Sequence, residues 1–145
     1  MNAVAKPFVV LLVEDDPADA SLVKRALRTW ERPIDIHHVV DGLEFLKFLR
    51  HEGSYATAPR PDIVLLDLNM PRMDGHEALK AIRADAKLQH LVVVVMTTSS
   101  SESDVARCYQ AGANSFITKP VDLDRFLEVM RGIELYWASI ARLPG

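Results

Sequence analysis

Continuous apolar runs alternate with amphipathic segments along most of the chain. The runs have the length of β-strands and are rich in Val, Ile and Leu; they cover residues 8–13, 36–40, 63–66, 91–96 and 115–118. Uninterrupted runs of this kind are typical of parallel strands that are buried on both faces. The segments between them show the 3.6-residue periodicity of helices. This alternation, repeated five times, predicts an α/β fold with one parallel sheet and helices on both faces.

Each predicted helix begins at a capping residue, and most of these residues are followed three positions later by an acid. The start signals are Asp16-Pro17 with Asp19, Asp41 with Glu44, Asp74 with Glu77, Ser101 with Asp104, and Asp122 for the last helix. A side-chain oxygen at the cap accepts hydrogen bonds from free N–H groups of the first turn. Pro17 falls at the first helical position, where its missing N–H costs little. We therefore interpret Asp16 as a structural cap first.

The expected topology is the flavodoxin-like, doubly wound (βα)5 arrangement, with a five-stranded parallel sheet in the order 2-1-3-4-5. This order places strands one and three side by side at the point where the chain reverses direction across the sheet. The segment 51–60 has little apolar content and contains Gly53, Ser54 and Pro59, so we expect a long surface loop there.

Acidic side chains follow directly after two of the apolar runs. Glu14 and Asp15 come after the first run, and Asp67 comes after the third. Side chains just past the carboxyl ends of parallel strands converge at the crevice where α/β folds bind ligands. Carboxylates packed together repel one another and need a cation, and oxygen ligands favour Mg²⁺. We expect a Mg²⁺ site formed by Glu14, Asp15, Asp67 and a main-chain carbonyl near Asn69.

The same strand ends carry residues suited to binding a phosphoryl group. Aspartate has an unperturbed pKa of ~3.9, so Asp67 should be ionised and able to attack phosphorus once a cation offsets the charge repulsion. Lys119, after the fifth run, offers a cation for a phosphoryl oxygen, and Thr97, after the fourth, offers a hydroxyl donor. The sequence therefore predicts a site for one divalent metal and one phosphoryl group.

Size and charge limit the function classes. At 145 residues and 49% hydrophobic content, the chain fits one globular domain, residues 1–145, and leaves no room for a separate effector domain. The formal charge of −3 argues against nucleic-acid binding. The apolar runs are far shorter than the ~20 residues of a membrane helix. A single cysteine, Cys108, excludes an internal disulfide and agrees with a cytoplasmic location.

The last predicted helix continues beyond the stripe that faces the core. Tyr136, Trp137 and Ile140 are spread too widely around this helix for one buried face. Excess apolar surface of this kind usually marks an interface, which predicts a homodimer through the C-terminal helix. The alternative, in which the tail folds back over the domain's own core, stays open.

Several motifs occur in order over nearly the whole chain. They are Leu12-Val13-Glu14-Asp15-Asp16, Leu65-Leu66-Asp67-Leu68-Asn69-Met70-Pro71 with Met73-Asp74-Gly75, Met96-Thr97-Thr98, Ala111-Gly112-Ala113 and Lys119-Pro120. Together they resemble the receiver domain of two-component response regulators. The resemblance implies that Asp67 accepts a phosphoryl group from a phosphohistidine on a sensor histidine kinase. It implies Mg²⁺ binding by the acidic pair Glu14 and Asp15. Thr97, Lys119 and Phe116 match the family's switch residues, and Phe116 would turn inward on phosphorylation. Such a protein is a phosphoacceptor and not an enzyme acting on other substrates.

Further features resemble the small stand-alone regulators that pair with bacterial phytochrome kinases. These are the loop 52–56, the run Thr97-Thr98-Ser99-Ser100 and the extended last helix ending at Leu143-Pro144. Some members of that group pair through the last strand and helix. Thr98 stands where a smaller residue is commoner, so Thr98 and its neighbour Ser99 are expected to tune the lifetime of the phosphoryl group.

Three other functions compete with this interpretation. A Mg²⁺-dependent phosphatase of the haloacid dehalogenase type would need a second aspartate two residues after the nucleophile, where this chain has Asn69. A flavodoxin-like flavin binder would need a phosphate-cradling loop after the first strand, where this chain has repelling acids. A receiver that drains or relays phosphate without a direct output stays open.

Overall fold

The computed structural model describes residues 6–144, so the terminal residues of the expected 1–145 domain lie outside the described part of the chain. Strands and helices alternate in the order β1 (Phe8–Val13), α1 (Pro17–Leu27), β2 (Ile34–Val39), α2 (Gly42–Leu49), η1 (Gly53–Tyr55), β3 (Ile63–Leu66), α3 (Gly75–Ala84), β4 (Val93–Thr97), α4 (Glu102–Gln110), β5 (Ser115–Thr118), α5 (Leu123–Ile133) and η2 (Glu134–Ile140). The strands form one parallel sheet in the order β2-β1-β3-β4-β5. The predicted flavodoxin-like fold and strand order are confirmed.

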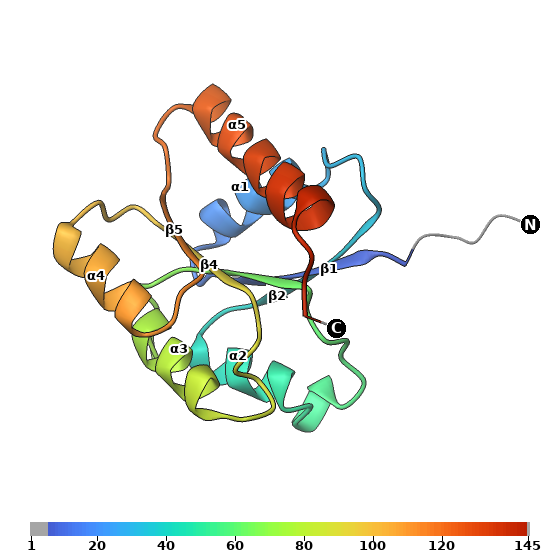
Figure 1. The fold of residues 1–145 in the computed structure, drawn as a ribbon, viewed down its shortest axis with the longest axis vertical. Coiled ribbons are helices and arrows are strands. Elements are labelled where there is room, and N and C mark those ends of the chain that lie inside the picture. The colour runs from blue at the N-terminus through green and yellow to red at the C-terminus, as the bar shows by residue number, and fades with distance from the viewer. Residues whose placement is uncertain (1–5, 145) are drawn as a thin grey trace, which may run out of the picture.

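The sheet separates two hydrophobic cores. Helices α1 and α5 cover one face, and α2, α3 and α4 cover the other (Figure 1). Strands β1, β3 and β4 are buried along their whole length because both faces are covered, whereas the edge strands β2 and β5 are mostly half-buried. This burial is the physical reason for the uninterrupted apolar runs.

The register of the sheet brings the ends of β1 and β3 level. Val13 is opposite Leu66 on one side and opposite Val39 on the other. The Asp67 N–H then donates a hydrogen bond to the Val13 carbonyl at 3.0 Å, and the Glu14 N–H donates to the Val39 carbonyl at 3.1 Å. Glu14 and Asp67, which are distant in sequence, therefore leave the sheet at neighbouring points.

The predicted helix caps are confirmed. Asp16, Asp41, Asp74, Ser101 and Asp122 each accept a hydrogen bond from a main-chain N–H in the first turn of the helix that follows. Pro17 is the first helical residue of α1, as predicted. These caps fix where each helix leaves the carboxyl edge of the sheet, and they thereby shape the loops around the acidic side chains.

The structure differs from the sequence prediction at the bounds of two strands and in one loop. Strand β2 covers residues 34–39 instead of 36–40, because β1 ends opposite Val39 and leaves Val40 unpaired and 48% exposed. Strand β4 covers residues 93–97 instead of 91–96. The loop 51–60 contains the short 3-10 helix η1, whose Tyr55 ring packs at 5.4 Å from the Phe48 ring. Among residues 6–144, no helix combines the length and the apolarity that crossing a bilayer requires.

Candidate functional site

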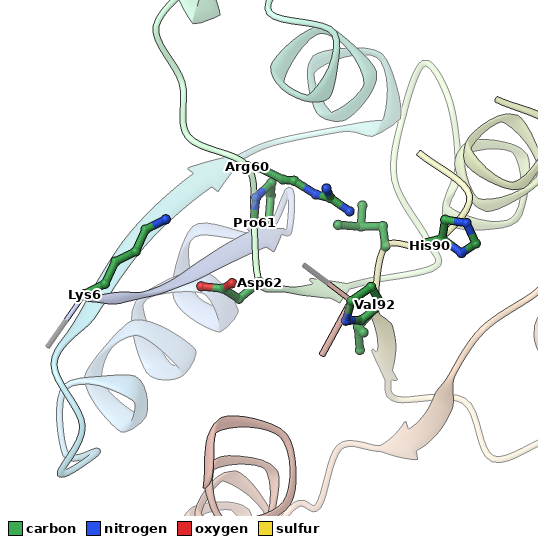
Figure 2. Close-up of a pocket in the computed structure, with 8 residues that line it drawn as sticks. Lys6, Arg60, Pro61, Asp62, His90 and Val92 are labelled. Atoms are coloured by element: carbon green, nitrogen blue, oxygen red, sulfur yellow. The ribbon is translucent and has the colours of Figure 1, made fainter. Parts of the chain in front are cut away.

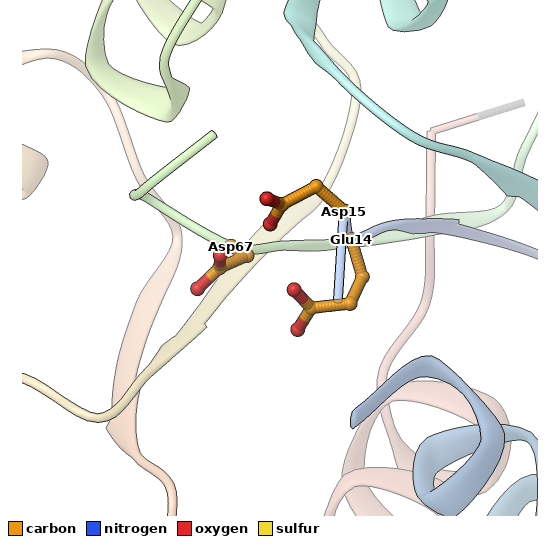
Figure 3. A group of neighbouring side chains, drawn as sticks. All are labelled: Glu14, Asp15 and Asp67. Atoms are coloured by element: carbon orange, nitrogen blue, oxygen red, sulfur yellow. The ribbon is translucent and has the colours of Figure 1, made fainter. Parts of the chain in front are cut away.

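Three carboxylates gather at the carboxyl edge of the sheet. Glu14 and Asp15 follow β1 and Asp67 follows β3, and Figure 3 shows their carboxyl groups facing a common space. One carboxylate oxygen from each of the three lies within 4.8 Å of the other two. Glu14 is buried, Asp67 is half-buried and Asp15 is exposed, so the cluster opens to solvent on one side. Three hard oxygen donors in this arrangement form a metal-binding cluster for a divalent cation.

The charge of Asp67 is poorly compensated within the protein alone. Burial, and after it the neighbouring Glu14 charge, raise the pKa of the Asp67 carboxyl to about 7 against the opposing effect of the Lys119 ammonium. A carboxyl group with a pKa raised in this way tends to keep its proton. A divalent cation that binds there displaces the proton and compensates the negative charge. The donor set of the cluster thus fits a hard cation.

Lys119 provides the positive charge beside the acids. Its Nζ donates a hydrogen bond to Glu14 Oε1 at 2.6 Å and lies 3.5 Å from Asp19 Oδ2. Burial alone would lower the pKa of the Lys119 ammonium, but the hydrogen bond that it donates to Glu14 and the charges of Glu14, Asp67 and Asp19 raise the pKa overall. Lys119 is therefore a permanent cation at this site.

The remaining predicted residues lie at the end of β4, in the loop that follows it, and in β5. Thr97 is fully buried, and its Oγ1 accepts a hydrogen bond from the Ser99 N–H at 3.4 Å. Thr98 is exposed, whereas Ser99 is half-buried and donates from Oγ to Asp104 Oδ2 at 2.6 Å. Phe116 is half-buried and packs against the core beneath α2, α3 and α4. Sequence reasoning placed Ser99 beside the phosphoryl site, and the structure adds a contact between Ser99 and the first turn of α4.

Two contacts of the site were missed from the sequence. The Nε2 of His38 donates a hydrogen bond to the Glu14 carbonyl at 2.8 Å, and Asp19 lies beside Lys119. The predicted strand order already placed β2 next to β1, so a polar side chain near the end of β2 was the available signal.

The C-terminal tail is partly folded onto the domain. Segment η2 is a π-helix, in which Tyr136 is 53% exposed and Ile140 is 66% exposed. Trp137 is half-buried against the core beneath α1 and α5, with its ring 4.9 Å from that of Tyr136. Of the three residues predicted for an interface, two therefore face outward and one packs inward.

Larger cavities lie away from the acidic cluster. A small void between Glu14, Asp67, Lys119 and the apolar core residues Leu12, Val23 and Met96 measures about 10 Å³, roughly one water molecule. A cavity of about 200 Å³ lies at the opposite end of the sheet, and Figure 2 shows the residues that line it, among them Lys6, Arg60, Asp62 and His90. Its acid, Asp62, accepts a hydrogen bond from the Val9 N–H at 2.7 Å. The acidic cluster therefore has no enclosed pocket for an organic substrate among the residues described.

Gly75 packs directly beneath the acidic loop. A Cβ atom at this position would lie 2.5 Å from the Asp67 carbonyl oxygen and 2.9 Å from Leu68 Cα. Both are backbone atoms, which cannot move without displacing Asp67. We expect Gly75→Ala to lower the free energy of unfolding by about 2 kcal/mol, as measured by urea denaturation.

Gly132 is the matched control for this substitution. It lies in α5, and nothing surrounds the position that its Cβ would take. Gly132→Ala should raise stability by about 0.5–1 kcal/mol through helix propensity alone. Equal effects of the two substitutions would contradict the close approach at Gly75.

Comparison with known proteins places this arrangement in a family. Residues 10–131 match the family described as the response regulator receiver domain. Response regulator Rcp1 from Synechocystis sp. strain PCC 6803 is 40% identical over 138 residues, which are 95% of this chain and 94% of Rcp1. The match therefore extends over nearly the full length of both proteins.

Solved structures agree with this match. The phosphorylated cyanobacterial phytochrome response regulator RcpA is 41% identical, with a TM-score of 0.92 over 97% of this chain and 100% of RcpA. The Mn²⁺-bound form of Rcp1 is 40% identical, with a TM-score of 0.85 over 96% of this chain and 100% of the Rcp1 chain. A relative that binds a divalent cation is consistent with the acidic cluster described above.

Proposed function

The chain belongs to the response regulator receiver domain family of two-component signalling, and from this premise we propose that Asp67 accepts a phosphoryl group from a sensor histidine kinase in a Mg²⁺-dependent reaction. The observation that carries the proposal is the position of Asp67. Its carboxyl lies beside the carboxyl groups of Glu14 and Asp15, and the positive charge of Lys119 also acts on it. A cation can therefore be held on one side of a phosphoryl group while Lys119 approaches from another.

The proposed step is a direct displacement at phosphorus. A carboxylate oxygen of Asp67 forms the new P–O bond as the P–N bond to the kinase histidine breaks, and the imidazole nitrogen keeps the electron pair. Glu14, Asp15, Asp67 and the Asn69 carbonyl would hold Mg²⁺, which offsets the repulsion between the carboxylates and the phosphoryl oxygens.

The output of this reaction is a conformational switch. The added charge of about −1.5 to −2 would attract the Thr97 hydroxyl and Lys119 toward Asp67. Phe116 packs only in part against the core, so it can move into the space that Thr97 leaves. Thr98, which is exposed, and Ser99, which is half-buried, follow Thr97 in the loop after β4. There they would tune the lifetime of the phosphoryl group.

The proposed partner is a kinase of the phytochrome type. Support comes from the near full-length similarity to RcpA, which is a phytochrome response regulator. Transfer assays with a phosphorylated phytochrome kinase and an unrelated histidine kinase test this pairing. Faster transfer from the unrelated kinase would contradict it.

A second copy of the chain is the proposed occupant of the exposed C-terminal face. The large apolar side chains Leu135, Tyr136 and Ile140 are each more than half exposed and lie along one segment, η2. Trp137, packed inward beside them, would support this surface. Sedimentation should show a dimer that Ile140→Glu dissociates. A monomer at high concentration, with and without phosphorylation, would contradict dimerisation.

Metal dependence provides the test of the proposed function. With acetyl phosphate and Mg²⁺, intact mass spectrometry should show a single phosphoryl adduct on the wild-type chain. Removing the divalent ion with EDTA should abolish the adduct, because the carboxylates then repel the donor. An adduct of equal yield in EDTA, or several adducts per chain, would overturn the proposal.

A further inference from the structure

Main-chain hydrogen bonds anchor the loop between β3 and α3 near both of its ends. This loop, residues 67–74, carries Asp67 and Asn69. On one side the Gly75 N–H donates a hydrogen bond to the Leu68 carbonyl at 2.9 Å. On the other side the Met73 carbonyl accepts a hydrogen bond from the Gly42 N–H, the first residue of α2, at 3.0 Å. Asn69 thus lies between two anchored points.

Arg72 adopts an unusual backbone conformation in this loop. Its φ of +65° lies in the left-handed region, which residues other than glycine seldom enter and which costs free energy. Surrounding contacts must therefore hold Arg72 in place. Gly42 provides close packing on this side, because a Cβ there would collide with the Met73 carbonyl and side chain.

The Arg72 side chain joins the loop to helix α2. Its Nε and one terminal nitrogen both lie 2.7 Å from Asp41 Oδ2. Asp41 is buried, and its other oxygen accepts from the Glu44 N–H as the cap of α2. A guanidinium nitrogen of Arg72 also lies 3.4 Å from Glu44 Oε1, and the Tyr55 hydroxyl donates to Glu44 Oε2 at 2.8 Å. The network joins the acidic loop, the start of α2 and the 51–60 loop.

We propose that Arg72 is a positioning residue, which clamps the β3–α3 loop to Asp41 and thereby presets the cation site at Asp67 and Asn69. The clamp acts through the loop backbone, because Arg72 does not contact the three carboxylates among the hydrogen bonds and ion pairs of residues 6–144. It resembles the groups around metal ligands that orient them without touching the metal. This inference rests on the proposed cation site.

The first arm of the test is amide hydrogen exchange in the metal-free protein. Asparagine tolerates the left-handed region, so Arg72→Asn removes the guanidinium while it keeps the backbone preference. The Gly42 amide, which donates to Met73, should exchange faster in this variant, as should the Met73 amide. Amides of β4, on the far side of Asp67, should exchange at the wild-type rate.

The second arm is the affinity for Mn²⁺ alone, measured by electron paramagnetic resonance. Arg72→Asn should weaken Mn²⁺ binding by about tenfold, the scale seen for groups that support metal ligands. Asp41→Asn keeps the cap acceptor but loses the ion pair, and it should weaken binding equally. The double variant should be no weaker than either single variant, because both remove one interaction.

Arg50→Asn is the matched control, since it breaks the Arg50–Asp85 ion pair at 3.7 Å, away from the acidic loop. It should leave Mn²⁺ affinity unchanged. Wild-type Mn²⁺ affinity in Arg72→Asn, or weaker binding with unchanged exchange at Gly42 and Met73, would overturn the clamp. A wild-type chain that binds no Mn²⁺ would instead overturn the cation site itself, so the two failures are distinguishable.

Discussion

Asp67→Asn is expected to abolish formation of the phosphoryl adduct with acetyl phosphate and Mg²⁺. An amide oxygen is a poor nucleophile toward phosphorus, and Asp67 is the half-buried acid of the cluster, where the charges of Glu14 and Lys119 both act on it. Intact mass spectrometry measures the adduct. A persistent adduct on this variant would place the acceptor elsewhere.

Asp74→Asn is the matched control, because it makes the same chemical change at the other end of the same loop. Asp74 caps α3 by accepting from the Glu77 N–H at 2.9 Å, and asparagine caps a helix about as well. This variant should be phosphorylated like the wild type. Loss of the adduct in both variants would mean that disturbance of the loop, and not loss of the acceptor carboxylate, prevents phosphorylation.

The same Asp67→Asn substitution should stabilise the metal-free protein. The pKa of Asp67 is about 7 in the folded chain, against an ordinary value of 3.8, so the folded state keeps a proton that the unfolded state has lost. Stability must then fall as pH rises from about 4 to about 7. Asparagine has no proton to lose. Because Asp67 is partly exposed and screened by solvent, we expect a gain of about 2 kcal/mol at about pH 8.

Mg²⁺ should reverse this order of stability. A ligand that binds the folded state stabilises it in proportion to the logarithm of its concentration over Kd, and the wild type offers a full set of carboxylates. Urea denaturation with and without Mg²⁺ measures both effects. An Asp67→Asn variant that is less stable than the wild type in EDTA would contradict the repulsion argued here.

The meeting of the three acids was predictable because it depends on short-range signals. Buried apolar runs give the parallel strands, and the strand order then places the ends of β1 and β3 side by side, where Glu14 and Asp67 follow. Local capping residues fixed the helix starts with similar reliability, because each cap bonds to a main-chain N–H two or three residues away.

Contacts between distant segments were not predictable in the same way. Arg72 and Asp41 lie 31 residues apart, and nothing in either local sequence indicates that they pair. The course of the C-terminal tail was not predictable either. The prediction used the 3.6-residue period of an α-helix, but η2 is a π-helix with i→i+5 bonding, whose faces follow a different period.

The second large effect is expected for Lys119→Met. Glu14 has a side chain only 3% exposed, and in this variant its carboxylate loses the ammonium that lies 2.6 Å from it. Removing one partner of a buried pair typically costs about 3–5 kcal/mol, because the remaining charge stays desolvated. We expect a loss of about 3 kcal/mol in metal-free urea denaturation.

Two variants separate this cause from a general loss of packing. Arg125→Met breaks an ion pair with Glu128 that is exposed on both sides, and it should change stability by less than about 0.5 kcal/mol. The double variant Glu14→Gln with Lys119→Met removes the stranded charge and should recover most of the lost stability. A double variant as unstable as Lys119→Met alone would assign the loss to packing.

The single variant Lys119→Met also tests whether Lys119 contacts the phosphoryl group or instead supports binding of the cation. Loss of a positive charge beside Glu14 and Asp67 strengthens their attraction for a divalent ion, so Mg²⁺ affinity should be unchanged or tighter in Lys119→Met. Phosphoryl transfer should nevertheless become much slower, because one cation facing the transferred oxygens is missing. Isothermal titration with Mg²⁺ and the rate of adduct formation at saturating Mg²⁺ measure the two quantities on one protein. If Mg²⁺ binding were lost together with transfer, Lys119 would act by holding the acidic cluster in place, and its proposed contact with the phosphoryl group would be wrong.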